Sequence, residues 1–294
     1  MVKAREKKPT KLDKIMNNFE SFSRNFVEIS NSNGNRQKLT FNLAQKQIVD
    51  ILEESKYLIL PKSRQAGCTT LFCSMALHRA ITIPHQTILI VSYSGESSTS
   101  IFNKLRDMNS HLPRKKYPDA FPDIKHENKN ELSFTNNSRI ISTVAADKTI
   151  GRSMSLDMVL LSELAFYNDI DRQLTGVLQA VNRSKDSRVI IESSANSMNS
   201  FYDMCMAAEK KQSRFKLFFL GFQHPLYLEQ WKEELDEAEQ WFKSVNGGKK
   251  MTPKDFDEAE KILYEKHDTH IRSICWRRYK LLDMSLEDFK QEFP

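Results

Sequence analysis

The sequence from residue 58 to residue 70 reads Leu58-Ile59-Leu60-Pro61-Lys62-Ser63-Arg64-Gln65-Ala66-Gly67-Cys68-Thr69-Thr70. An apolar strand leads into a tight loop, and a helix with one apolar face begins at Thr69. This order of elements is typical of a phosphate-binding P-loop, in which backbone N–H groups and a helix N-terminus surround phosphate oxygens. The stretch therefore predicts a nucleotide-binding α/β protein, and the alternative is a chance strand-turn-helix.

The loop departs from the usual P-loop pattern, G-x-x-x-x-G-K-[ST]. Gly67 and Thr69 are in register with that pattern, but Cys68 occupies the position of the lysine. Lys62 stands where the first glycine is expected, and Arg64 follows as a second cation. Because nucleotide phosphates need a positive charge nearby, we expect Lys62 and Arg64 to replace the missing lysine.

Composition indicates an ordinary globular protein. The 294 residues are 39% hydrophobic and 28% charged, enough for a large core. No apolar run approaches the length of a membrane span and the N-terminus lacks an apolar signal segment, so we expect a cytoplasmic protein. The four cysteines form no CxxC pair, which argues against structural zinc and a disulfide framework. The net charge of +6 is a mild indication of a polyanionic partner.

The sequence divides into three regions that differ in composition and hydrophobic pattern. Residues 1–38 are polar and basic, with one short amphipathic helix, and residues 223–294 are charged and helical. Between them, in residues 39–222, short apolar runs alternate with helical patterns, which predicts a mostly parallel sheet flanked by helices. Two asparagines within residues 131–142 predict a β-hairpin. We expect strands at residues 57–60, 87–91, 138–144, 158–161, 188–191 and 215–220, and helices at residues 45–54, 69–80, 97–109, 172–180 and 200–211.

A second apolar strand, residues 158–161, ends in Ser162-Glu163. In nucleotide-hydrolysing P-loop proteins such a strand ends in two acids, one that holds Mg²⁺ and one that polarises the attacking water. The first acid is replaced here by Ser162, a poorer partner for the metal, whereas Glu163 remains as a candidate general base. The alternative is a glutamate that ends a buried strand and caps a helix.

Three further features are candidates for nucleotide chemistry. Arg152 follows a glycine and fits an arginine finger, although most loop arginines are simply solvated. Ser193, Ser194 and Asn196 follow a strand and could sense the γ-phosphate, or form an ordinary strand-to-helix turn. The amide of Gln45, before the P-loop strand, could recognise the adenine edge.

These elements in this order resemble the ATPase domain of the large terminase subunit of tailed bacteriophages, the DNA-packaging motor. The loop S-R-Q-x-G-x-T-T is the most specific part, and residues 198–202 and 276–294 also look like that family. The resemblance covers residue 39 to the end. It implies an ASCE-type, RecA-like P-loop fold with a helical linker subdomain, and ATP hydrolysis with Mg²⁺ that drives double-stranded DNA into a procapsid.

The resemblance also implies partners and residue roles. The implied partners are DNA, contacted through its backbone, the capsid portal protein, the small terminase subunit and further copies of the chain in a pentameric ring. The implied location is the host cytoplasm, on the procapsid. In isolation we expect a monomer. The implied roles are catalysis by Glu163 and Arg152, metal binding by Thr69 and Ser162, and coupling by Ser193, Ser194 and Asn196. The implied nucleotide-binding residues are Gln45, Lys62, Ser63, Arg64, Gln65, Ala66, Gly67, Cys68, Thr69 and Thr70.

Full-length members of that family carry a C-terminal nuclease, and this sequence stops at Pro294, about where the joining segment begins. We therefore expect no DNA cleavage. Two other functions stay open. One is another DNA-stimulated, helicase-like P-loop ATPase, although no second RecA-like domain is recognisable. The other is a nucleotide-binding scaffold with little hydrolysis, which Cys68 and Ser162 keep open.

Overall fold

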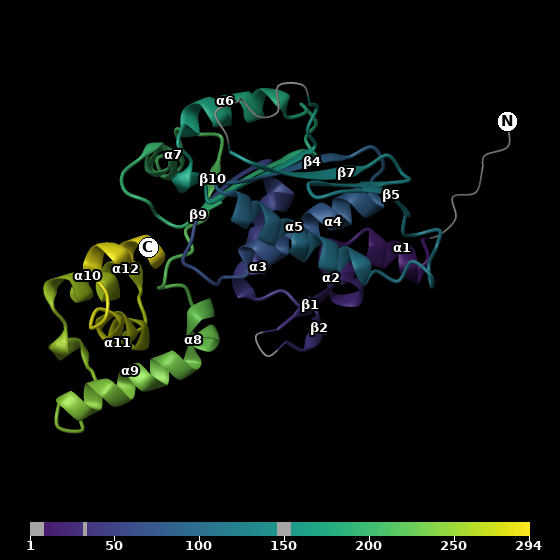
Figure 1. Ribbon diagram of the computed structural model, residues 1–294. Helices are drawn as coiled ribbons and strands as arrows, with labels where there is room; N and C mark the ends of the chain where they lie inside the picture. The colour runs from purple at the N-terminus through teal and green to yellow at the C-terminus, as the bar shows by residue number, and fades with distance from the viewer. Residues whose placement is uncertain (1–8, 32–33, 146–153) are drawn as a thin grey trace, which may run out of the picture.

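The computed structural model describes residues 9–31, 34–145 and 154–294. An eight-stranded sheet forms the centre of the molecule, with strand order β10-β3-β9-β8-β4-β7-β6-β5 (Figure 1). Six neighbouring strands are parallel, so the predicted mostly parallel α/β fold is confirmed. The parallel strands are β3 (Tyr57–Pro61), β4 (Thr87–Ser92), β7 (Arg139–Val144), β8 (Met158–Ser162), β9 (Arg188–Ser193) and β10 (Lys216–Leu217).

Helices cover both faces of the sheet because the strands are apolar on both faces. Alternate residues such as Leu60 and Ile190 join one core cluster with α3, α4 and α5, while Ile59 and Ile191 join another with α6 and α7. Figure 1 shows these two layers on opposite sides of the sheet. Their bounds are α3 (Leu43–Glu54), α4 (Cys68–Thr82), α5 (Gly95–Ser110), α6 (Ile170–Ala180) and α7 (Ser200–Glu209).

The predicted hairpin is confirmed and lies at one edge of the sheet. Strand β6 (Glu131–Phe134) pairs antiparallel with β7, and Asn137 takes the left-handed conformation with φ 64°. A further strand, β5 (Ile124–Glu127), pairs with β6 at the edge. It was not predicted because it is short, fully exposed and mostly polar.

The opposite edge is shorter than predicted. Strand β10 contains two residues instead of six. Backbone pairing nevertheless continues, since Phe218 N and Leu220 N donate to Ile59 O at 3.0 Å and Pro61 O at 2.9 Å. An edge strand needs only one row of backbone partners, so this segment follows β3 without regular strand geometry.

The N-terminal region packs against the α4 side of the core. It forms α1 (Lys11–Met16), α2 (Phe19–Phe26), and a small hairpin of β1 (Glu28–Ser30) and β2 (Arg36–Lys38). Sequence patterning predicted only one short helix here; α1 is separate because Thr10 forms a capping box and Asn18 caps α2. Phe22 is fully buried in the same cluster as α4.

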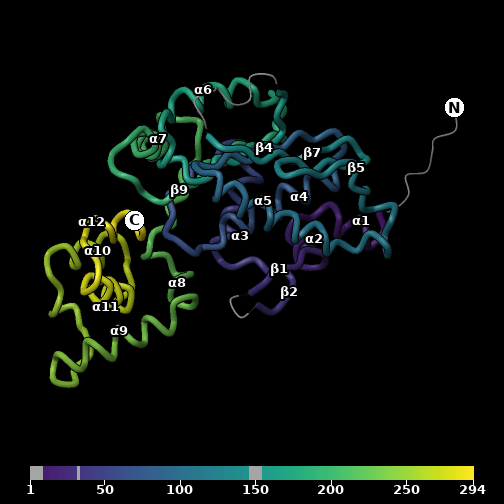
Figure 2. Tube along the Cα trace, in the orientation of Figure 1, coloured from purple at the N-terminus to yellow at the C-terminus, as the bar shows by residue number. Residues whose placement is uncertain are grey.

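Residues 223–294 are helical, as predicted. Figure 2 shows these helices gathered in one bundle beside the sheet. The bundle packs around aromatic side chains, with Trp231 and Trp276 stacked at a centroid distance of 4.5 Å. The helices are α8 (Leu226–Gln230), α9 (Lys232–Val245), α10 (Glu258–His267), α11 (Ile271–Lys280) and α12 (Leu286–Glu292). The division of the chain into domains at residues 38 and 222 stays a prediction.

Across the part of the chain that the structure describes, every helix is too short or too polar to cross a lipid bilayer.

The first stability prediction concerns Phe22. Replacing this fully buried ring by alanine leaves a cavity next to Phe26 and Phe121, so we expect Phe22→Ala to lower the free energy of unfolding by about 3–5 kcal/mol. Urea denaturation measures it. The control is Arg24→Ala on the exposed face of the same helix, with an expected change below about 0.5 kcal/mol. Equal effects in both variants would show that α2 is not part of the core.

The second stability prediction concerns His78, whose Nε2 lies 2.8 Å from Met16 O. Burial lowers the pKa of His78 from 6.5 to about 4, because the charged ring is disfavoured inside the protein. The unfolded chain then binds the proton more tightly, so this contribution is complete above pH 6.5 and is lost as the pH falls toward 4. Between pH 7 and pH 5 we expect the loss of about 2 kcal/mol of unfolding free energy.

The control for this pH effect is His78→Gln, whose amide can still donate to Met16 O. Urea denaturation at the two pH values should show a smaller loss in this variant than in the parent. Identical pH dependence in the two proteins would contradict the assignment.

Candidate nucleotide site

The P-loop connects the end of β3 to the start of α4. Gln65 and Gly67 have left-handed backbones, with φ 64° and 76°. The left-handed backbone of Gly67 favours glycine, and a Cβ atom there would also lie 2.9 Å from Nε2 of the Gln45 side chain. Within the described residues, no side chain caps the first turn of α4, which begins at Cys68. Its first N–H groups are therefore available to an anion.

Lys62 lies buried at the start of the loop, between two carboxylates. Its Nζ is 2.9 Å from Glu163 Oε1 and 3.1 Å from Glu192 Oε2. Burial disfavours the charged ammonium group, but the attraction of Glu192 and Glu163 outweighs burial and raises the pKa of Lys62 above its ordinary value. The loop therefore contains a permanently charged lysine, six residues before the position where the usual pattern has one.

Glu163 follows the last residue of β8 and has a left-handed backbone, with φ 56°. Besides the contact with Lys62, its Oε2 accepts hydrogen bonds from Ser194 N at 2.9 Å and from the hydroxyls of Ser193 at 3.3 Å and Ser194 at 3.4 Å. Burial alone would raise the pKa of Glu163, but the charge of Lys62 and these hydrogen bonds lower it. Glu163 is thus ionised at neutral pH.

Glu192 is a site residue that sequence reasoning missed. It is fully buried near the end of β9, opposite Leu60 on β3 and Ser162 on β8. Ser162 Oγ donates to Glu192 Oε1 at 2.6 Å, and burial raises the pKa of Glu192 against the influence of Lys62. The signal in the sequence was an acid at the end of the apolar run Val189-Ile190-Ile191.

The candidate coupling residues lie beside Glu163. Ser193 Oγ accepts a hydrogen bond from Ala165 N at 3.1 Å, and Asn196 Nδ2 donates to Ala165 O at 2.9 Å. Asn199 donates to the same carbonyl at 2.8 Å. The loop after β9 is thereby attached to the turn after β8, so the two loops are expected to move together.

Gln45 is attached to the P-loop from the side of α3. Its Oε1 accepts from Asn42 N at 3.0 Å, and its Nε2 donates to Gly67 O at 2.9 Å. Asn42 Nδ2 also lies 3.3 Å from Ala66 O. The structure thus places Gln45 next to the loop, while its contact with adenine stays a prediction.

The other loop residues differ in burial, and Ser63 and Ala66 are both buried. Thr69 is half-buried in the first turn of α4, and Thr70 Oγ1 accepts from Lys104 Nζ at 3.2 Å. Cys68 is buried, and burial raises the pKa of its thiol to about 12, so it is a neutral thiol at physiological pH. Arg152 lies outside the described residues, and its role stays a prediction.

The C-terminal helical bundle contacts both nucleotide-site loops. The side chain of Arg64, which is 64% exposed, pairs with Glu292 at the end of α12, and Arg64 N donates to Glu292 O at 3.2 Å. Gln230 Nε2 donates to Gln65 O. On the other loop, Ala195 N donates to Gln291 O at 3.2 Å. The end of α12 therefore contacts the P-loop and the loop after β9 together.

A mostly apolar cavity of about 460 Å³ lies where the bundle meets the core. Asn196 lines it on the core side, together with Phe201 of α7 and Leu217 of β10, and Leu263 of α10 lines the opposite side. Apart from this cavity, the two parts share a core, since Trp231 and Trp276 of the bundle belong to the same buried cluster as Leu60.

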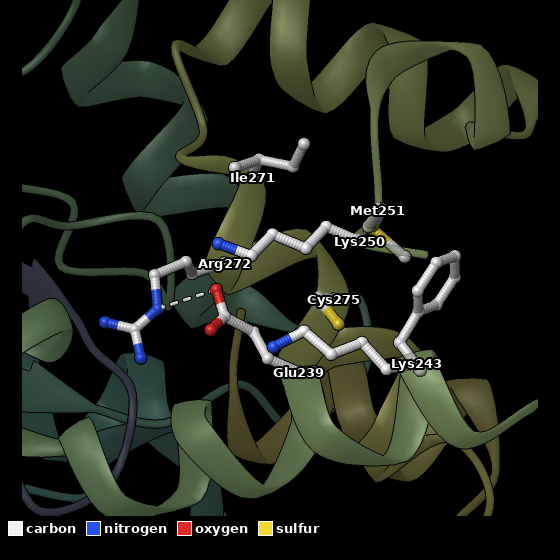
Figure 3. Close-up of a pocket in the computed structure, with 8 residues that line it drawn as sticks. Glu239, Lys243, Lys250, Met251, Ile271, Arg272 and Cys275 are labelled. Atoms are coloured by element: carbon white, nitrogen blue, oxygen red, sulfur yellow. Dashed lines mark hydrogen bonds and ion pairs between the residues drawn. The ribbon is translucent and has the colours of Figure 1, made fainter. Parts of the chain in front are cut away.

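A second cavity, of about 110 Å³, lies within the bundle itself (Figure 3). It is lined by side chains of α9, α11 and the segment before α10, including Lys243 and Lys250. Arg272 Nε there pairs with Glu239 Oε1 at 3.1 Å. The residues that line it are all distinct from the predicted nucleotide-binding residues.

The side chains at the site suit an Mg²⁺ ion that is shared with a nucleotide. Among the described residues, no group of three or more His, Cys, Asp or Glu side chains could hold a metal alone. Protein-bound Mg²⁺ with a nucleotide needs only one or two protein oxygens, because phosphates and water complete its shell. Thr69 in the first turn of α4, and Glu163 and Glu192 at the ends of β8 and β9, carry oxygens of the type that such a shared site uses.

Comparison with known proteins identifies the fold. No protein-family model matches the chain. The structure is similar to the large terminase of bacteriophage HK97, with a TM-score of 0.61 and 16% identity over 94% of this chain and 53% of that one. It is also similar to the large terminase ATPase domain of Thermus phage P74-26, with a TM-score of 0.54 and 14% identity over 81% of this chain and 87% of that domain.

A mutant form of the Thermus phage domain gives a TM-score of 0.57 at 14% identity, over 86% of this chain and 93% of that one. This chain spans about half the length of the HK97 terminase. At these identities the likeness establishes the fold. The resemblance inferred from the motifs is thus confirmed for the architecture: the chain has the P-loop fold of phage large terminase ATPase domains.

Proposed function

We propose that this protein hydrolyses ATP to drive double-stranded DNA into a viral procapsid. The observation that carries the proposal is the contact of Lys62 with Glu163, whose carboxylate is held by Ser193 and Ser194. A P-loop cation, a buried acid and a polar loop after the next strand are the parts that γ-phosphate hydrolysis needs. The shared terminase fold supports the choice of motor over other P-loop ATPases.

The residues of the site would have different roles in hydrolysis. The N–H groups of the loop and of the first turn of α4 bind phosphate oxygens, and Lys62 and Arg64 supply positive charge. Glu163 orients a water molecule and accepts its proton as the water oxygen bonds to the γ-phosphorus and the bond to ADP breaks. Mg²⁺, when bound with ATP at Thr69, neutralises phosphate charge.

Lys62 would also regulate the base. While Lys62 pairs with Glu163, it stabilises the carboxylate and makes it a weak proton acceptor. Phosphate oxygens compete for the same ammonium group. When Lys62 turns to the phosphates, the pKa of Glu163 rises and the residue becomes a better base. The base would thus be activated only with nucleotide in place.

Two contacts connect hydrolysis to movement. The loop after β9 is bonded to Glu163 through Ser194 and to the helical bundle through Ala195. The P-loop is bonded to the same helix, α12, through Arg64. Loss of the γ-phosphate would therefore change both contacts at the C-terminal end of α12, and movement of the bundle against the core would translocate DNA.

DNA would be held mainly through its backbone phosphates, since a packaging motor accepts any sequence. Lys115 and Lys116 are candidate contacts. Arg114 beside them has a structural role, since its guanidinium donates to Asn109 O, Asn109 Oδ1 and Pro122 O. The proposed partners also include the portal protein, the small terminase subunit and further copies of the chain in a ring, in the host cytoplasm on the procapsid.

The first prediction for this function uses steady-state phosphate release from ATP with Mg²⁺. We expect Glu163→Gln to lower the rate by about 10²–10⁴-fold, because the base is lost, and Lys62→Ala to abolish turnover by removing the P-loop cation. The controls are Glu237→Gln and Lys232→Ala, which change exposed residues of α9. An unchanged rate in Lys62→Ala would contradict the role of this lysine. ATP binding without turnover in the parent would favour the scaffold function.

The second prediction concerns Arg64, which Glu292 and a bound phosphate would share. Glu292→Gln frees the guanidinium, and because an exposed ion pair contributes at most about 1 kcal/mol, we expect ATP to bind up to about fivefold more tightly. Titration with a fluorescent ATP analogue measures the affinity. Glu287→Gln on the same helix is the matched control.

Arg64→Ala completes the test. In this background Glu292→Gln should have no further effect on affinity, because the arginine that it frees is gone. An equal gain in both backgrounds would show that Glu292 acts on nucleotide binding by another route.

A further inference from the structure

We propose that Glu192 supplies the carboxylate that binds the nucleotide's magnesium ion, in place of the acid that Ser162 replaces. The inference rests on the proposed function, because it assumes that the site binds ATP with Mg²⁺. It assigns a role to a residue that neither the motif pattern nor the order of elements singles out.

The position of Glu192 follows from strand alternation. Side chains two residues apart point to the same face of a sheet. Leu60, Leu160 and Ile190 belong to the core cluster on the α4 face. Two residues after Leu160 and Ile190 stand Ser162 and Glu192, which are opposite each other on β8 and β9. Both therefore face α4, the helix whose first turn forms the phosphate site.

The strand order explains how Glu192 can take the place of an acid at residue 162. Strand β9 lies between β3, which leads into the P-loop, and β8, which carries Ser162. A carboxylate on β9 at this register is one strand nearer to the P-loop than a carboxylate at residue 162 would be. Ser162 Oγ donates to Glu192 Oε1 at 2.6 Å. This hydrogen bond holds the Glu192 carboxylate beside residue 162, where the usual pattern has the acid.

Among the described residues, the other oxygen of Glu192 is paired with Lys62 alone. Within residues 9–31, 34–145 and 154–294, Oε2 accepts no hydrogen bond, although Glu192 is completely buried. Its one compensating contact is the ion pair with Lys62 at 3.1 Å. The neighbouring strand β4 ends in Ser92, in register with Ser162, and the buried Ser92 Oγ also has no hydrogen-bond partner in this part of the chain. Glu192 Oε2 and Ser92 Oγ are thus buried polar atoms whose hydrogen-bonding capacity a polar ligand would satisfy.

The balance of buried charges favours a divalent cation as the ligand. One ammonium group, that of Lys62, serves both Glu163 and Glu192. A nucleotide that attracts Lys62 to its phosphates would leave Glu192 as a buried carboxylate without a counter-ion, which is strongly unfavourable. A divalent cation that arrives with the nucleotide removes this cost, and a carboxylate oxygen is the ligand type that Mg²⁺ prefers. The exchange keeps the buried carboxylate neutralised in both states.

A purely structural role for Glu192, as counter-ion of Lys62, is the competing explanation. That role would affect folding stability without affecting the metal. The decisive quantity is therefore the affinity of the protein–nucleotide complex for a divalent ion, measured without turnover. Electron paramagnetic resonance of Mn²⁺, titrated into protein saturated with ADP, reports this affinity directly.

We expect Glu192→Gln to weaken Mn²⁺ binding by about 10- to 100-fold. Ser162→Ala keeps the carboxylate, so it should retain most of the Mn²⁺ affinity, and Glu163→Gln should retain it too. The double variant Ser162→Asp/Glu192→Gln, which returns the acid to β8, should recover it. ADP binding to metal-free protein, measured with EDTA, checks that each variant still binds nucleotide.

Parent-level Mn²⁺ affinity in Glu192→Gln would overturn the inference and leave the proposed function intact. Loss of affinity in Ser162→Ala comparable to that in Glu192→Gln would also overturn it, in favour of Ser162 as the metal partner. If Glu192→Gln does not fold, the Ser162→Ala result decides between the two residues. A parent protein that binds no nucleotide would overturn the proposed function and the inference together.

Discussion

The ion pairs of Lys62 with Glu163 and Glu192 are the interaction on which the site depends. They connect the ends of three adjacent strands, β3, β8 and β9, at the edge of the sheet where α4 begins. Each of these charges alone would be strongly unfavourable at this depth, and removing one leaves another uncompensated. The three side chains therefore form one unit, and any ligand that attracts Lys62 must also resolve the charge that Lys62 leaves behind.

Two residues around this unit have a strained backbone. Glu163 and Gln65 are left-handed although neither is glycine, and such residues cost of the order of 1–3 kcal/mol each. In both places hydrogen bonds hold the strained segment: Ser194 N bonds the Glu163 carboxylate, and Gln230 bonds the Gln65 carbonyl. One of these contacts comes from the loop after β9 and the other from the helical bundle. The geometry of the site is thus maintained by the parts of the protein that would move in a motor.

Much of the fold followed from the sequence because local rules determine it. The apolar run before Lys62, the paired asparagines of the hairpin and the alternation of strands and helices are local signals, and the structure has the corresponding elements. Lys62 and Glu163 were identified from their positions after two apolar strands, and they lie in contact. Glu192 was missed because its importance depends on strand order: β9 comes last of the three in sequence but lies between β3 and β8 in the sheet. The pairing of Arg64 with Glu292 joins distant parts of the chain, which no local pattern indicates.

The two departures from the usual motifs are best understood together. Cys68 stands in place of a lysine and Ser162 in place of an acid, so the motif positions have lost one positive and one negative charge. Lys62 and Glu192 restore one of each, and they are paired with each other. Lys62 also pairs with Glu163, directly after β8, whereas Glu192 on β9 would lack a cation without Lys62. The buried Glu192 therefore depends on Lys62, and together the two residues keep one positive and one negative charge beside the loop.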